Sequence, residues 1–146
     1  MVVALILGLL LGTEREIRGH PAGIKTMGLI SIGACMFTAL GLLPFLGKNV
    51  DPTRIAAQIV TGVGFLGAGA ILRTGDDVHG LTTAASIWVA AAVGMAVGFG
   101  YYGISIFTTV LVIGMLVALR PIEERFIRNR WNRRKDDPPV PDHREH

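Results

Sequence analysis

Charge is scarce along most of this chain of 146 residues. Only 11 of its 25 Asp, Glu, Lys and Arg residues lie in the first 119 positions, and the other 14 lie between Arg120 and His146. A soluble domain of that size could not cover its surface with so few charges. A hydrophobic content of 51% also excludes an intrinsically disordered chain. We therefore expect an integral membrane protein.

Cysteine is almost absent too, because Cys35 is the single one, which excludes a disulfide framework and a multi-cysteine metal site. No serine or histidine pattern indicates a nucleophile with its base, so we expect no enzyme and no cofactor, and a metal site stays undefined. The segment Gly62–Gly67 matches the dinucleotide fingerprint, but it lies inside an apolar run without a preceding strand. The excess of basic residues adjoins an apolar segment, which favours anionic lipid headgroups over nucleic acid.

Long apolar runs are what the chain does have, and a membrane-spanning helix needs roughly 20 such residues. The predicted spans are residues 1–12, 26–46, 55–72, 81–100 and 101–119. The first is short, at about 18 Å for a rise of 1.5 Å per residue. It is either a span that lacks its first turns, a short span that thins the bilayer, or a half-inserted segment. The charge distribution favours the first two interpretations.

The basic residues also predict an orientation. With five spans, twelve Lys and Arg residues lie on the side of loops 13–25 and 73–80 and of the tail, against two in loop 47–54. This asymmetry places the N-terminus outside and the C-terminus in the cytoplasm. The predicted fold is thus an all-α membrane bundle of about five helices joined by short loops. The basic tail, residues 120–146, is expected to form a surface helix and then a disordered, proline-containing end.

Small residues predict where the helices approach one another closely. Four glycines concentrate in the third segment, and further glycine pairs with GxxxG spacing occur in the first and fourth. We expect the third helix to be the most closely packed, either inside one subunit or between subunits. The expected helix-packing residues are Gly62, Gly64, Gly67, Gly69, Gly94 and Gly98.

Polar residues near the ends of the spans are candidates for a site. Arg54 and Gln58 share a helical face and either form one wall of a polar pocket or fix helix packing by a hydrogen bond. The hydroxyl residues at the start of the fourth span either cap that helix or line the pocket. Glu14 and Arg15 are expected at the membrane edge, where they set topology, bind a cation or pair with a basic residue of the same side. Asp51 is expected to cap the third helix.

Together, the residues that we expect to bind a ligand or a partner are Glu14, Arg15, Lys25, Asp51, Arg54, Gln58, Arg73, Thr82, Thr83 and Ser86. Arg54 is predicted on the outer side, whereas Glu14, Arg15 and Thr83 are predicted on the inner side. These residues cannot all touch one ligand unless helices are broken inside the membrane.

Five motifs in order resemble the MgtC/SapB family: Gly12–Glu16, Pro21–Thr26, Asp51–Gln58, Gly62–Gly69 and Gly80–Trp88. The resemblance implies a bacterial inner-membrane protein with about five spans. Members of the family are associated with growth in low magnesium, virulence and inhibition of the proton-translocating ATP synthase. Thr13 and Lys25 depart from the residues common in the family. Longer members carry a soluble ACT-like C-terminal domain, whereas about 27 residues follow the last predicted span here, so the short members are the closer comparison.

Two hypotheses follow. The first is a non-enzymatic regulator that acts through membrane helix contacts, either as a homo-oligomer or with a membrane-protein partner such as ATP synthase. The alternative is a transporter or ion-binding membrane protein with a polar pocket between its helices.

Overall fold

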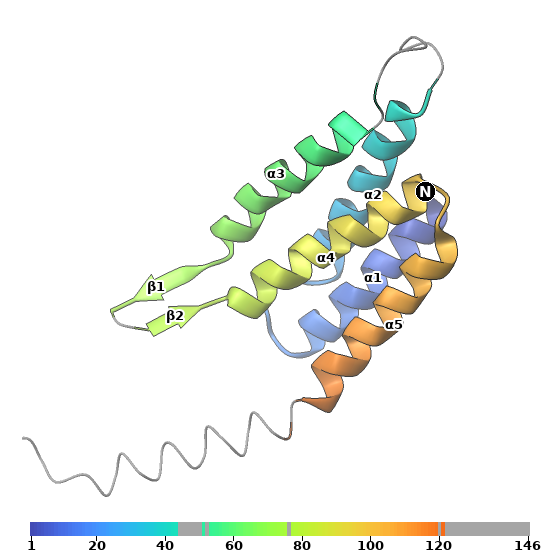
Figure 1. Ribbon diagram of the computed structural model, residues 1–146. Coiled ribbons are helices and arrows are strands. Elements are labelled where there is room, and N and C mark those ends of the chain that lie inside the picture. The colour runs from blue at the N-terminus through green and yellow to red at the C-terminus, as the bar shows by residue number, and fades with distance from the viewer. Residues whose placement is uncertain (44–50, 52, 76, 120, 122–146) are drawn as a thin grey trace, which may run out of the picture. The chain divides into compact units, whose positions relative to one another are not determined.

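The computed structural model describes residues 1–43, 51, 53–75, 77–119 and 121. The described residues form five helices and a two-stranded antiparallel sheet (Figure 1). The elements are α1 (Val2–Ile17), α2 (Ile24–Gly41), α3 (Thr53–Gly69), β1 (Leu72–Thr74), β2 (Asp77–His79), α4 (Leu81–Gly98) and α5 (Tyr102–Ala118).

The chain divides into two compact units, Met1–Ile113 and Gly114–His146. The fold described below is that of the first unit. In the second unit, the described residues up to Ala118 complete α5. Apart from residue 121, the predictions for residues 120–146 lie outside the described part of the chain.

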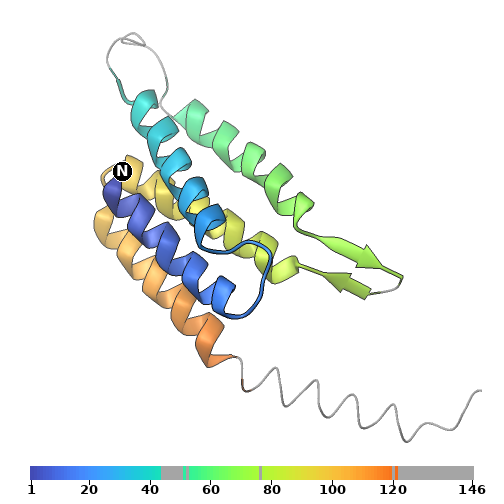
Figure 2. The same cartoon turned by 180° about the vertical axis from the view of Figure 1, so that it is seen from behind.

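Helix α4 is the central element of the first unit, because it packs against α1, α2 and α3. Successive helices reverse direction, as Figures 1 and 2 show for α1 to α4. The buried positions of α4 recur every three or four residues from Thr83 to Val97, which is the spacing of one helical face. The core lies between α1, α2 and α4 and contains mostly small and medium side chains, such as Ala4, Leu11, Met27, Ala34, Ala90 and Val93.

Small residues let these three helices approach closely around Ser31 of α2. The Ser31 hydroxyl donates to the carbonyl oxygen of Ala4 on α1 at 2.7 Å. A Cβ atom added to Gly8 of α1 would lie 2.7 Å from the Ser31 Cβ, and one added to Gly94 of α4 would overlap the Ser31 carbonyl oxygen. Larger residues at these glycines would therefore force α1, α2 and α4 apart.

The two strands correct the prediction of a purely α-helical fold. They extend α3 and α4 as a hairpin with Arg73 opposite Val78, in a segment that was predicted as a loop. Gly80 closes the base of this hairpin with a φ of +90°, and an added Cβ would collide with the Ala70 carbonyl oxygen. Both features require glycine. Strands of three residues are too short to show an alternating pattern in the sequence.

Helix boundaries differ from the predicted spans at several ends. Helix α1 continues to Ile17 rather than ending at residue 12, and α3 ends at Gly69 rather than at residue 72. Helix α2 begins at Ile24, two residues before the predicted start. Among the described helices, α2 and α4 are long and apolar enough to cross a membrane, and α5 is a shorter apolar helix. The count of five spans and their sidedness stay predictions.

Candidate functional site

A cluster of charged side chains is buried where α1 meets α4. Glu14 and Arg15 were expected at the membrane edge, just beyond the first span, and their side chains are only 7% and 3% exposed. The Glu14 carboxylate forms an ion pair with the Arg18 guanidinium, one turn along α1, and lies 3.8 Å from Nη1 of Arg15. Because each charge has an opposite charge close by, α1 continues through this segment instead of ending at its first charged residue.

Arg15 also connects two helices. Its Nη2 donates a hydrogen bond to Oγ1 of Thr83 on α4 at 3.1 Å, and both residues are buried. The Glu14 carboxylate oxygens are buried and accept no hydrogen bond from the described residues, so ion pairs alone compensate this charge. The structure thus brings together Glu14, Arg15 and Thr83, the three residues that were predicted on the same side of the membrane.

Glu16 completes the connection by reaching α2. Its Oε2 accepts a hydrogen bond from the backbone N–H of Ile24 at 2.8 Å. Ile24 is the first residue of α2, and the preceding Gly23 has no side chain to cap the helix. Glu16 therefore takes the role of an N-terminal cap from a neighbouring helix.

We predict that Glu16→Ala destabilises the protein by about 1 kcal/mol, the usual cost of losing an N-terminal cap. Glu16→Gln keeps an oxygen that can accept the Ile24 N–H, so its loss should be smaller. Thermal unfolding of the two variants measures the difference. Equal losses in both would show that the charge of Glu16, rather than its hydrogen bond, stabilises α2.

The other predicted residues of this end do not join the cluster. Lys25 and Thr82 are exposed, and the Ser86 hydroxyl donates to the Thr82 carbonyl oxygen of its own helix at 2.8 Å. Arg73 is exposed on β1, where its Nε donates to the carbonyl oxygen of Gly75 at 3.0 Å. Pairing with Lys25 or Arg73 was one of the alternatives for Glu14, and in the structure its ion-pair partner is Arg18, which follows the last residue of α1.

Asp51, Arg54 and Gln58 lie at the opposite end of the fold, at the start of α3. Oδ1 of Asp51 accepts hydrogen bonds from the hydroxyl of Thr53 at 2.7 Å and from its backbone N–H at 2.8 Å. These two bonds, and then the attraction of Arg54, lower the pKa of Asp51 below its ordinary value of 3.8. The separation of these residues from Arg15 and Thr83 argues against one site that includes both sets.

The lowered pKa gives a pH dependence with a defined sign. Since the folded protein favours the ionised Asp51, its contribution is present above the ordinary carboxyl pKa and is lost as the pH falls through the lowered value. We expect the wild type to unfold at a higher temperature than Asp51→Asn near pH 7, with the gap closing below about pH 3.8. A gap that is independent of pH would show that the charge of Asp51 contributes nothing.

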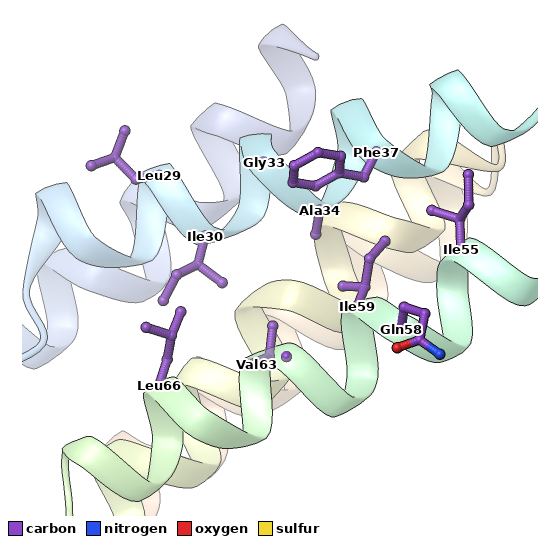
Figure 3. A pocket seen from close by; sticks show the side chains of 11 residues that line it. Leu29, Ile30, Gly33, Ala34, Phe37, Ile55, Gln58, Ile59, Val63 and Leu66 are labelled. Carbon is purple, nitrogen blue, oxygen red and sulfur yellow. The ribbon is translucent and has the colours of Figure 1, made fainter.

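An apolar groove runs between α2 and α3, with a volume of about 560 Å³. Figure 3 shows Ile30 of α2 facing Leu66 of α3 at one end, and Ala34 opposite Ile59 nearer the other end. Gln58 is the single residue with a polar side chain among those that line the groove, and it is exposed on α3. This groove was not predicted, because apolar residues that line it have the same sequence pattern as residues of a closed core.

The glycines of α3 lie where the chain itself leaves space. A Cβ added to Gly62, Gly64 or Gly69 would meet no atom of the described residues within 4 Å, and one added to Gly67 would make ordinary contact with Ala84. Inside the chain, α3 is thus not the most closely packed helix, contrary to the prediction. By contrast, a Cβ at Gly98 would lie 2.7 Å from the Cβ of Thr38. Contact of α3 with another chain stays a prediction.

Two side chains at this end of α1, Arg18 and Glu16, were not among the predicted site residues. Arg18 follows Glu14 by four residues, and this spacing is a recognised signal for an ion pair on a helix. The capping role of Glu16 has no local signal, because its partner Ile24 belongs to another helix.

The geometry defines a small helical protein with an ionic cluster buried at one end and an apolar groove on its side. The model of the MgtC family matches residues 1–125, and the chain belongs to this family. The resemblance drawn from the five motifs is therefore confirmed. No solved structure matches the chain at a significant level.

Named relatives agree with this assignment. Protein MgtC of Brucella suis is 44% identical over 119 residues, which cover 82% of this chain and 49% of the relative. The Escherichia coli protein named "putative magnesium transporter YhiD" is 40% identical over 128 residues, covering 84% of this chain and 60% of the relative. The chain spans about half to three-fifths of the length of these relatives.

Proposed function

We propose that this chain is a multi-pass protein of the bacterial inner membrane, and that it acts as a non-enzymatic regulator through contacts between membrane helices. Its many exposed apolar side chains support the membrane location, since lipid would cover them. Examples are Leu29 at 69% exposure, Phe65 at 82% and Phe107 at 67%. The proposed orientation has the N-terminus outside and the C-terminus in the cytoplasm, as the basic residues predict.

The observation that carries the regulatory role is an uncovered small-residue face of α3. Ala57, Thr61, Gly64 and Ala68 recur at intervals of three or four residues, and all four are exposed. They therefore share one side of the helix. In membranes such faces let a second helix approach until the two backbones are in van der Waals contact. We call these four residues the small face of α3.

The partner is either a second copy of this chain or another membrane protein. The family assignment makes the proton-translocating ATP synthase the first partner to test, with magnesium limitation and virulence as the setting. These roles are proposed from the resemblance alone.

Cysteine cross-linking in native membranes tests the contact. Single cysteines replace the four residues of the small face of α3 in a Cys35→Ala background, and the buried Val63 and Gly67 serve as matched positions. We expect products between chains or with a partner from the small face but not from the buried positions. Uniform absence of products would contradict the regulatory proposal.

The alternative is transport or ion binding, and one observation favours it. Glu14 and Arg15 are buried charges within an apolar helix, and such residues in membrane proteins often mark ion pathways. The name of the relative YhiD points to magnesium. An observation against transport is that Glu14 already forms an ion pair with Arg18, and Arg15 donates a hydrogen bond to Thr83.

Flux of Mg²⁺ into proteoliposomes separates the two functions. Purified, folded protein is compared with an Arg15→Met variant and with empty vesicles. Flux that requires the protein and falls in the variant would support transport over regulation. Flux equal to that of empty vesicles would leave regulation as the better proposal.

A further inference from the structure

The groove between α2 and α3 becomes more apolar along its length. At the end where α3 begins it carries the amide of Gln58, and Arg54 lies one helical turn before that amide on the same face. Towards the other end its lining is purely apolar, with Gly62, Val63 and Leu66 of α3. Ile55 also lines the first end, and Arg54 lies beside the groove and not in its lining. A cation at the mouth, one amide and an otherwise apolar lining match a phosphate, an ester and an acyl chain.

The length of the groove matches one leaflet of a bilayer. From Ile55 to Leu66, the α3 residues that line it rise about 16 Å at 1.5 Å per residue. Half of a hydrocarbon core of roughly 30 Å is about 15 Å. The groove therefore has the length of a single acyl chain that hangs from the headgroup region at the start of α3.

We propose that the groove binds one phospholipid, with an acyl chain between α2 and α3, the ester carbonyl accepting a hydrogen bond from the Gln58 amide, and the phosphate beside Arg54. This site rests on the membrane insertion proposed above and not on the regulatory role. It lies on a different side of α3 from the small face, since Gln58 and Gly62 line the groove and Gly64 does not.

A second helix fits the groove less well than an acyl chain. A helix with its side chains is about 10–12 Å across, whereas an extended acyl chain is much thinner. A partner helix would also need a polar group at the position of Gln58, to form a hydrogen bond with its amide. An acyl chain with its ester satisfies the amide and fills the apolar part together.

The charge at the start of α3 is compatible with a phosphate. Asp51 is the acidic group next to Arg54, and its Oδ1 accepts hydrogen bonds from the hydroxyl and the backbone N–H of Thr53. Arg54 is exposed. The helix dipole adds a partial positive charge at the same end, where α3 begins.

Titration of the delipidated full chain with dioleoylphosphatidylglycerol, followed by native mass spectrometry in detergent, tests this site. Gly62→Leu of α3 and Gly33→Leu of α2 each place a side chain in the groove, where an added Cβ meets no atom within 4 Å. Gly103→Leu is the matched control, because Gly103 lies on α5, away from the groove, and has the same open space. Two variants on different helices guard against misfolding of one.

We expect the wild type and Gly103→Leu to bind one phospholipid, and both groove variants to bind at least about tenfold more weakly. Arg54→Gln should weaken phosphatidylglycerol about threefold and leave dioleoylglycerol, which has no phosphate, unchanged. Inorganic phosphate alone should not be retained.

Three results would overturn the proposal. The first is equal binding by the wild type and both groove variants, and the second is an equal loss in Gly103→Leu. The third is a lipid-free dimer of the wild type that Gly62→Leu dissociates, since a second copy would then occupy the groove. If the protein were folded and monodisperse without detergent, that result would instead contradict the proposal that it is inserted in a membrane. The two failures are therefore distinguishable.

Discussion

Replacing Gly94 by alanine should cost about 3 kcal/mol of stability, although the change adds a single methyl group. The added Cβ would overlap the Ser31 carbonyl oxygen on α2, and a backbone atom cannot move away as the end of a side chain can. Overpacking of this kind usually costs 1–3 kcal/mol, and the rigid contact places Gly94 at the upper end. In detergent, the unfolding temperature should fall by roughly 6–12 °C.

Gly64→Ala is the matched control for this prediction. The substitution is identical, but an added Cβ on α3 meets no atom within 4 Å. Since alanine restricts the unfolded chain more than glycine does, we expect a gain of about 0.5 kcal/mol. The two variants thus change stability in opposite directions. A Gly94→Ala protein as stable as the wild type would show that α2 and α4 do not approach as closely as the structure has them.

Removing the charge of Arg15 should have an effect of similar size. Arg15→Met takes one partner from the buried Glu14 carboxylate and the hydrogen-bond donor from Thr83. Breaking a buried ion pair typically costs about 3–5 kcal/mol, because the remaining charge stays desolvated. Arg18 still faces Glu14, which places the expected loss near 3 kcal/mol. Thermal unfolding in detergent measures it.

The double variant Glu14→Gln/Arg15→Met separates pairing from packing. If Glu14 and Arg15 stabilise each other, the double variant should lose at least about 1 kcal/mol less than the sum of the two single losses. Lys25→Met is the control at the same end, where an exposed cation should change stability by less than about 0.5 kcal/mol. Strict additivity would show that the two side chains contribute independently.

The helices could be predicted from the sequence because long apolar runs need no tertiary information. The end of α1 could not, since the burial of Glu14 and Arg15 depends on their contacts with Arg18 and with Thr83 of α4. The separation of Arg54 from Thr83 was predicted correctly, because it depends on the alternation of successive helices alone.

The positions of the glycines show where sequence information ends. Gly64 and Gly94 both lie in apolar segments with other small residues nearby, so their local patterns are alike. In the structure one faces open space and the other touches a backbone carbonyl. Which face of a helix meets the rest of the chain depends on the helix pairs that form, and small residues are equally compatible with either arrangement.

The three consecutive residues Glu14, Arg15 and Glu16 fix the rotational register of α1. Successive residues point about 100° apart around a helix, and here they engage α1 itself, α4 and α2 in turn. Inserting one residue between Gly8 and Thr13 would turn the preceding part of α1 by that angle relative to these anchors. Gly8 would then leave Ser31, so the length of α1 is constrained as strongly as its composition.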